Sequence, residues 1–317
     1  MPLLKATMKK ILLLIICFDF LAAFSQDKKD TTINFDGKVI TLSEVVVNNK
    51  INVPAFIDRL RNDTTFYKAF RTLHIIGFSS LNDVRMLNSD GDIKASLRSK
   101  IRQTRSGNCR RMQTLEETTT GDIYDENKNF NYYTGEMYAG LFFTKDSICG
   151  EDNIVKGREF STSGLSGMEK HKQQLKMLFF NPGKKISGLP FISDKTPIFD
   201  KSMEDKYDMS IDMEEYNKTS CYIFKITAKP ESKNDVVIDE MTTWFNDKTF
   251  EIVARNYSLS YDAGVYDFNV QMQVEMTKAG NLLVPALIRY VGNWKAIFKK
   301  RERGIFTATL FDFNDGK

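Results

Sequence analysis

The sequence is poor in the residues that most often build catalytic or metal sites. Its 317 residues include two histidines, His74 and His171, and four cysteines. No two cysteines have the C-x-x-C spacing of a zinc or redox site, and neither histidine lies in an H-E-x-x-H motif. A nucleophile pair of Cys149 with His171 has no neighbouring residue that would activate the thiol. We therefore predict no catalytic residue, no metal site and no cofactor.

Proline, long apolar runs and charge of one sign are also scarce. With 7 prolines and 18 glycines the chain is neither collagen-like nor of low complexity. Beyond the N-terminal region, no apolar run approaches the roughly 20 residues of a membrane-spanning helix, so we expect no transmembrane segment in the mature chain. The 45 basic and 41 acidic residues leave a formal charge of +4, which gives no general argument for nucleic-acid binding.

Residues 1–25 have the order of a secretory signal peptide. A lysine pair precedes an apolar run over 11–18, and small residues stand at the −3 and −1 positions before Gln26. This order predicts cleavage just before Gln26 and export of the chain. The true start is either Met1 or Met8, which directly precedes the lysine pair. A buried apolar N-terminal helix is the alternative interpretation.

Removal of the signal peptide leaves three cysteines, Cys109, Cys149 and Cys221. An odd number permits at most one internal disulfide. Cys109 and Cys149 flank the same predicted group of strands, so they are the pair that we expect to be joined in an oxidising compartment. Three buried thiols that pack as small apolar side chains are the alternative.

Two segments precede the main body of the sequence. Residues 26–53 are interpreted as an N-terminal arm, in which a β-branched run over 39–47 predicts a strand or a strand-like linker. From Pro54 to Phe70, apolar and aromatic residues recur at helical spacing. This spacing predicts a helix with its aromatic side on a sheet.

Most of the remaining sequence has the two-residue period of β-strands. Between Tyr266 and Met276, apolar residues alternate with polar ones, which indicates a strand with one buried and one solvated face. A long antiparallel sheet with one or two helices over its apolar face predicts an α+β protein whose sheet is curved into a half-barrel. The predicted strands cover residues 73–86, 92–105, 110–119, 130–138, 140–143, 221–228, 236–246, 249–261, 265–276, 282–292 and 304–313.

A second helix and a loop-rich segment interrupt these strands. The apolar pattern over 168–180 predicts a helix that ends at the turn Asn181-Pro182-Gly183. The sequence that follows, 183–218, is expected to be a loop-rich insertion. We treat 54–317 as a single domain.

The C-terminal third is similar to a known family. It has the order D-x-x-T-T-W-F-N-D-K-T-F-E-I-V-A-R over 239–255, then G-N-L-L-V-P-A-L-I-R-Y over 280–290 and F-x-x-x-L-F-D-F over 306–313. Together with a hairpin-like segment at 78–102, these motifs resemble the periplasmic carriers and receptors of lipoprotein localisation (LolA/LolB-like). The resemblance implies an eleven-stranded antiparallel half-barrel closed by helices. It also implies a place in the periplasm or at the periplasmic face of the outer membrane, and no catalytic set.

The resemblance further implies a lipid or acylated ligand that is bound non-covalently. A half-barrel presents a concave apolar face, and a shift of the helix over 168–180 would open it. The alternative is a structural or docking module with a filled core, whose arm adds a strand to an outer-membrane protein partner. In either case we expect a monomer and no nucleic-acid partner. The residues expected on the concave face and its lid are Leu175, Phe179, Tyr266, Phe268, Val270 and Met272.

A run of basic residues is the most unusual local composition. Seven lysines and arginines fall between Asp92 and Glu116 with no acidic residue among them. Alternate positions share one face of a strand, so four of them form a basic stripe that could meet lipid phosphates or an acidic partner. A solvated outer face with edge-protecting charges is the alternative. The basic stripe consists of Lys94, Arg98, Lys100 and Arg102.

Overall fold

The computed structural model describes residues 30–35, 38–45, 53–144, 146–155, 174, 177–186, 192–262, 266–296 and 300–314. The predicted signal peptide, residues 1–25, lies outside this part of the chain. The strands are β1 (Asp30–Phe35), β2 (Lys38–Val45), β3 (Gly77–Leu87), β4 (Ile93–Ser106), β5 (Cys109–Thr120), β6 (Ile148–Cys149), β7 (Tyr207–Tyr216), β8 (Thr219–Ala228), β9 (Ile238–Asn246), β10 (Ile252–Asp262), β11 (Tyr266–Ala279), β12 (Leu282–Ala296) and β13 (Glu302–Asn314). The helices are α2 (Val53–Asn62), α3 (Thr65–Thr72), α4 (Tyr133–Phe142) and α6 (Lys201–Glu204).

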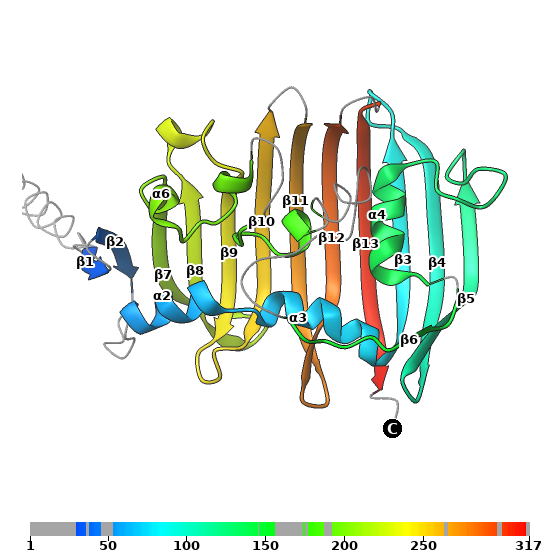
Figure 1. Ribbon diagram of the computed structural model, residues 1–317, viewed down its shortest axis with the longest axis horizontal. Coiled ribbons are helices and arrows are strands. Elements are labelled where there is room, and N and C mark those ends of the chain that lie inside the picture. Colours follow the sequence, from blue (N-terminus) through cyan, green and yellow to red (C-terminus); the bar gives the residue numbers. More distant parts are fainter. Residues whose placement is uncertain are drawn as a thin grey trace, which may run out of the picture.

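All of these strands form one open sheet with the order β1-β2-β7-β8-β9-β10-β11-β12-β13-β3-β4-β5-β6. From β7 to β6 every neighbouring pair is antiparallel. Helices α2, α3 and α4 lie on the same face of the sheet, α2 and α3 across the lower ends of the strands and α4 over β13 and β3 (Figure 1). The expected α+β fold, a long antiparallel sheet curved into a half-barrel with helices on one face, is confirmed.

The two faces of the sheet differ as the sequence pattern predicts. Along β11, Phe268, Val270, Met272 and Val274 are buried on the helix-covered inner face, whereas Gln271 is exposed on the outer face. The inner side chains of the other strands join them and the helices in one continuous core. The interior is thus apolar and lies between the sheet and the helices. None of the helices in the described ranges is long and apolar enough to cross a membrane.

The predicted helix after Pro54 is two helices. Asp63 lies between α2 and α3, where its carboxylate accepts hydrogen bonds from the backbone nitrogen of Thr65 at 3.0 Å and from the Thr65 hydroxyl at 2.6 Å. Such local side-chain bonds compete with continuation of the helical hydrogen-bond ladder. The break lets both short helices follow the sheet, and α3 packs against β12.

The strand pair predicted over 130–138 and 140–143 is wrong, because this segment contains helix α4. The segment is rich in aromatic residues, which favour strands, and this is why strands were expected. The helix begins where Glu302 of β13 accepts hydrogen bonds from the backbone nitrogens of Tyr133 and Thr134, both at 2.8 Å. A carboxylate at a helix N-terminus satisfies unpaired N–H groups and interacts favourably with the helix dipole.

Gly304 allows the start of α4 to approach the sheet. Gly292 of β12 is paired with Gly304 of β13. A β-carbon on Gly304 would lie 2.8 Å from a methyl carbon of Thr134 at the start of α4, so a larger residue would push the helix away. Next to the glycine pair, the rings of Tyr290 and Phe306 stack with centroids 4.6 Å apart.

The arm and the insertion also differ in part from expectation. The predicted strand over 39–47 corresponds to β2, which pairs in parallel with β7 and antiparallel with β1. Its neighbour β7 lies inside the segment 183–218, so the expectation of a loop-rich insertion is wrong from Tyr207 onward. The alternation of buried and less buried residues at the start of β7 is the pattern of a half-buried strand.

Candidate functional site

The structure brings the predicted lid and the predicted concave face together at Phe179. The Phe179 ring lies 6.0 Å from the ring of Phe268 and 6.3 Å from that of Tyr290, measured between centroids. Phe268, Val270 and Met272 all face this interior. Tyr266 is the first residue of β11, whereas Leu175 lies outside the described residues.

The interior next to these side chains is filled. Phe179 and Met272 are each 3% exposed, Phe268 is 4% exposed and Val270 is fully buried. Phe179, in the described end of the predicted lid, is also held by a hydrogen bond from the Tyr257 hydroxyl on β10 to its backbone oxygen. Burial raises the pKa of Tyr257 well above its ordinary value, so this hydroxyl stays protonated and can donate. We call this contact the lid latch.

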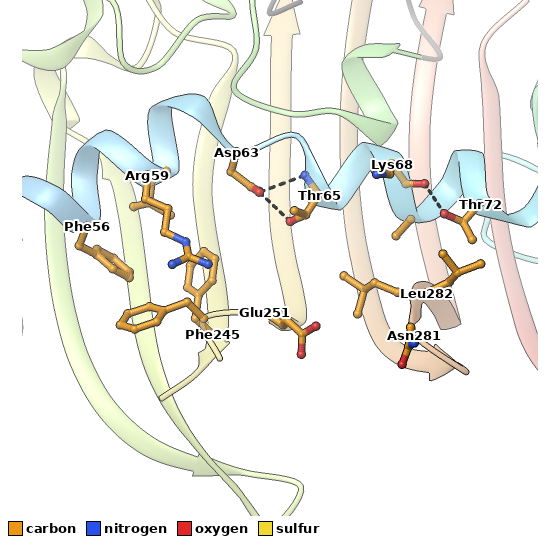
Figure 2. Close-up of a pocket in the computed structure, with 14 residues that line it drawn as sticks. Phe56, Arg59, Asp63, Thr65, Lys68, Thr72, Phe245, Glu251, Asn281 and Leu282 are labelled. Atoms are coloured by element: carbon orange, nitrogen blue, oxygen red, sulfur yellow. Dashed lines mark hydrogen bonds between the residues drawn. The ribbon is translucent and has the colours of Figure 1, made fainter. Parts of the chain in front are cut away.

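A cavity of about 230 Å³ lies elsewhere on the inner face, between α2, α3 and the lower ends of the strands (Figure 2). For comparison, an engineered apolar cavity of about 150 Å³ binds benzene. The walls of the 230 Å³ cavity are mostly apolar, and charged side chains from the helices and from the turn before β10 lie among the apolar ones. The apolar and aromatic residues that line it are Phe56, Leu60, Ala69, Phe245, Phe250, Leu282 and Leu283, and the charged ones are Arg59, Asp63, Lys68 and Glu251.

The mouth of this helix-side cavity is held by charged contacts. The Arg59 guanidinium lies 5.0 Å from the centre of the Phe250 ring, a cation–π arrangement. Glu251 forms an ion pair with Lys278 at 2.9 Å, and the hydrogen bond from Lys278 is the main cause of its lowered pKa. An acyl chain would fit the apolar wall, with basic and acidic groups both near the opening.

The sequence pattern did not predict this cavity. One of its walls is Phe250, which lies in the turn before β10 with a positive φ of 57° and stacks on Tyr222, with the centroids 5.5 Å apart. The sequence offers one signal for the cavity: Phe250 is a bulky apolar residue in a turn otherwise built of Asn, Asp, Lys and Thr.

In the basic stripe, Arg98, Lys100 and Arg102 lie on the outer face of β4, whereas Lys94 lies at a register shift, with its ammonium 5.1 Å from the centre of the Tyr132 ring just before α4. Three members of the stripe have acidic neighbours and one, Arg102, has no charged or hydrogen-bonding partner among the described residues. Exposed ion pairs of this kind contribute little to stability. The pairs are Lys94 with Asp122 at 3.7 Å, Arg98 with Asp83 at 3.3 Å and Lys100 with Glu116 at 3.9 Å.

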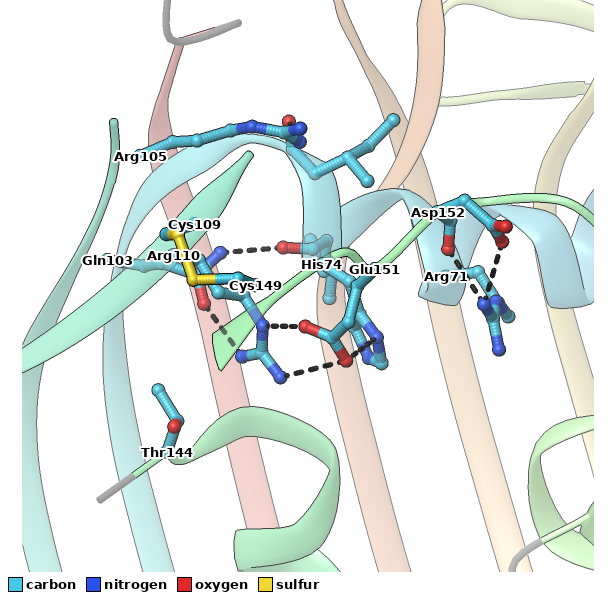
Figure 3. Close-up of polar contacts among 12 residues, drawn as sticks. Arg71, His74, Gln103, Arg105, Cys109, Arg110, Thr144, Cys149, Glu151 and Asp152 are labelled. Carbon is cyan, nitrogen blue, oxygen red and sulfur yellow. Dashed lines mark hydrogen bonds and ion pairs between the residues drawn. A yellow bond between two sulfur atoms is a disulfide. The ribbon is translucent and has the colours of Figure 1, made fainter. Parts of the chain in front are cut away.

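Cys109 and Cys149, the pair expected from the sequence, form a disulfide between β5 and β6 (Figure 3). Cys149 is therefore no nucleophile in this form, and His171 lies outside the described residues. Cys221 is a free, buried thiol. No cluster of three or more metal-ligating side chains occurs in the described ranges.

The segment that carries Cys149 is also tied down by ion pairs. Glu151 contacts the Arg110 Nε at 2.5 Å and the His74 Nδ1 at 2.9 Å, as Figure 3 shows. Burial opposes ionisation of Glu151, but the Arg110 hydrogen bond and the nearby charges of His74 and Arg110 together lower its pKa. Residues 148–152 thus form a strap across the end of the sheet, with Asp152 bound to Arg71 at 3.0 Å.

Comparison with known proteins gives structural likeness only. No protein-family model and no curated protein sequence matches the chain. The crystal structure of a DUF1329 family protein from Desulfovibrio piger matches with 12% sequence identity over 79% of this chain and 91% of that chain, with a TM-score of 0.23. A domain described as an outer membrane lipoprotein-sorting protein, from Vibrio parahaemolyticus, matches with 7% identity over 78% and 88%, with a TM-score of 0.27. Because both TM-scores are below 0.5, the fold assignment rests on the strand order and register given above.

Proposed function

We propose that this protein is an exported binding protein that holds a lipid or another hydrophobic molecule non-covalently on the inner face of its half-barrel. The observation that carries the proposal is the helix-side cavity of about 230 Å³, which has an apolar wall inside an aromatic-rich core. Pockets that bind apolar ligands are typically largely preformed, with a few polar groups at one end. No chemical step is part of this function.

The place of action that we propose is the periplasm or the periplasmic face of the outer membrane. The signal-like order of residues 1–25 supports export. The disulfide between Cys109 and Cys149 supports an oxidising compartment, since such bonds are rare where thiols are kept reduced.

Larger ligands would require the lid to move. Phe179 fills the space over Phe268, so a second acyl chain could enter there only if the lid latch at Tyr257 opened. In this proposal the basic stripe does not contact the ligand. Its role is to attract an anionic membrane surface to the outer face of the sheet.

The test is native mass spectrometry with lipid extraction. The full chain is produced with export in a Gram-negative host and purified gently from the periplasm. We expect a co-purifying lipid or acylated peptide in stoichiometric amount, and weaker retention in Leu282→Asp, which places a charge in the apolar wall of the helix-side cavity. Gln271→Asp, on the outer face of the neighbouring strand β11, is the control and should retain the ligand. A ligand-free mass that stays unchanged after incubation with lipids would contradict the proposal.

A docking module is the second candidate, and one observation favours it. Strand β5 pairs with β6 only at Cys109 and Arg110, so its remainder presents an open edge within the described part of the chain. Leu115 on this edge is 37% exposed. An extended segment of a partner protein could add a strand there. Co-purification of an outer-membrane protein instead of a lipid, lost on Thr118→Pro, would support this candidate.

A further inference from the structure

The outer face of the sheet carries basic and acidic residues in separate regions. The register places the outward side chains of β12, β13, β3 and β4 next to one another, and basic residues recur among them. On β7, β8 and β9 the charged outward residues are mostly acidic instead. The first region, which we call the basic half, contains Arg289 of β12, Arg85 of β3, and Arg98, Lys100 and Arg102 of β4. The second, the acidic half, contains Asp208, Asp212 and Glu214 of β7 and Glu240 of β9, with Lys225 of β8 among them.

The basic half stays positive although two carboxylates lie within or beside it. Asp83 of β3 contacts two arginines, Arg85 at 2.7 Å and Arg98 at 3.3 Å. The hydrogen bond from Arg85 is the main cause of its lowered pKa, so this carboxylate is ionised in neutral solution. Lys100 lies 3.9 Å from Glu116 of β5. These two carboxylates neutralise only part of the charge of the five basic side chains.

Two large apolar side chains are exposed within the basic half. Leu81 of β3 is 50% exposed and is paired with Lys100 of β4. Val291 of β12 is 48% exposed and lies two residues after Arg289, on the same face of the strand. Binding to a membrane surface gains both from buried apolar area and from attraction to anionic lipids. The basic half offers both kinds of contact.

Protection of a sheet edge does not account for this arrangement. Charges that prevent edge-to-edge pairing stand on edge strands. Strands β12, β13, β3 and β4 lie inside the sheet, each between two neighbours. Arg289 and Arg98 belong to one cross-strand row, in which Thr307 and Asp83 lie between them. Three strand spacings separate the two arginines, or about 14 Å. The charge is thus spread over a broad surface, as suits a partner with many anionic groups.

We infer that the basic half of the outer face docks on an anionic lipid bilayer, with Leu81 and Val291 buried among the headgroups. Each lysine or arginine near an anionic membrane surface strengthens binding roughly fivefold. The same surface repels the acidic half, so the separation of charge sets which part of the sheet faces the membrane. The inference rests on the membrane role proposed for the basic stripe and defines the surface that makes the contact. Helices α2 and α3, which border the helix-side cavity, lie on the opposite face of the sheet and would point away from the bilayer (Figure 1).

The experiment measures binding of the full exported chain to lipid vesicles by co-sedimentation. Mixed vesicles of phosphatidylcholine and phosphatidylglycerol are compared with vesicles of phosphatidylcholine alone, at about 0.1 M salt. We expect binding to the anionic vesicles, much weaker binding to them at about 1 M salt, where charges are screened, and little binding to the neutral ones. The double variant Arg102→Gln, Arg289→Gln should bind the anionic vesicles roughly twentyfold to thirtyfold more weakly. Leu81→Ser should bind them about fivefold more weakly, because half of a leucine side chain is no longer buried on docking.

The control removes the same amount of charge from outside the basic half. It is the double variant Lys225→Gln, Lys233→Gln, in which Lys225 lies on the outer face of β8 and Lys233 is exposed before β9. This variant should keep most of its binding to anionic vesicles. An equal loss in both double variants would show that net charge, and not the basic half, binds the vesicles, and would overturn the inference. All of the substituted side chains are exposed, and urea unfolding midpoints verify that each variant is folded.

The outcomes separate this inference from the proposed ligand binding. If the wild-type chain does not bind anionic vesicles at about 0.1 M salt, or binds neutral ones equally well, the inference is overturned, whereas a co-purifying lipid would still support the ligand site. Capture of an acidic protein through Arg102 and Arg289 without vesicle binding would make this surface a protein interface and would also overturn the inference. If the vesicles bind as expected but the protein takes up no lipid, the ligand function fails and the membrane surface stands.

Discussion

Loss of the disulfide between Cys109 and Cys149 should destabilise the protein by an amount set by the loop that it closes. The cysteines are 40 residues apart in sequence. The chain-entropy relation for cross-links gives about 4 kcal/mol at 25 °C for a loop of this length. For a domain of this size, that corresponds to a lowering of Tm by roughly 8–16 °C. The loop includes α4 and ends in the strap, so the effect should appear in the global unfolding transition.

The assay is urea unfolding of the oxidised chain and of the double variant Cys109→Ser, Cys149→Ser, followed by tryptophan fluorescence and circular dichroism. We expect a lower midpoint with an unchanged slope, and no further change when reductant is added to the double variant. Cys221→Ser is the control for thiol removal, since this buried cysteine forms no bridge. A double variant within about 1 kcal/mol of the wild type would refute the reasoning, because the ion pairs of the strap would then suffice to hold the loop.

Three further predictions concern the core and its charged groups. Phe306→Ala should cost about 3–5 kcal/mol of unfolding free energy in urea titrations, because the ring is fully buried between others. Burial raises the pKa of Asp239 against the opposing effect of its Ser260 hydrogen bond, so its stabilising contribution is present at low pH and lost as pH rises through the folded pKa. Asp239→Asn should therefore stabilise the protein at pH 7 and lose this advantage below about pH 4, as measured by unfolding midpoints across pH. Glu151→Gln should cost about 2 kcal/mol at pH 7, because it weakens a bond to the buried Arg110, and this cost should vanish as pH falls through the lowered folded pKa of Glu151.

Most of the strands could be predicted because each has its own alternation of apolar and polar residues. In β11 the alternation of apolar and polar residues alone fixes which side chains face the core. Turn residues such as Asn281 and Gly280 then mark where β11 ends and β12 begins. Consecutive strands joined by a turn pair antiparallel with each other, so little more than the strands and turns is needed to predict the sheet. The fold class could therefore be predicted from local patterns.

The elements that were not predicted depend on side-chain contacts that no periodicity encodes. Helix α4 is specified by Glu302, which is 169 residues from Tyr133, whereas its local sequence is rich in strand-forming aromatics. The break between α2 and α3 depends on a local contact, in which the Asp63 carboxylate binds Thr65 two residues later. A tertiary partner thus decided the structure at α4, and a local side-chain contact decided it at Asp63.

The candidate site was predicted in its type of surface but not in its location. Alternation placed Phe268 and Met272 correctly on the inner face, yet it could not tell whether this face was open or filled. The cavity is lined by Phe250 in a turn and by residues of two short helices, and no periodicity encodes how these segments come together.

An acyl chain alone would gain little by displacing Phe179. The Phe179 side chain is buried against Phe268 and Tyr290, and full burial of such a side chain contributes about 2 kcal/mol. An acyl chain in its place would replace these apolar contacts with similar ones. Because a ligand shifts an equilibrium only by its difference in affinity for the two states, such a chain would not favour displacement of Phe179. The helix-side cavity needs no such displacement, so it is where we expect a single acyl chain to bind first.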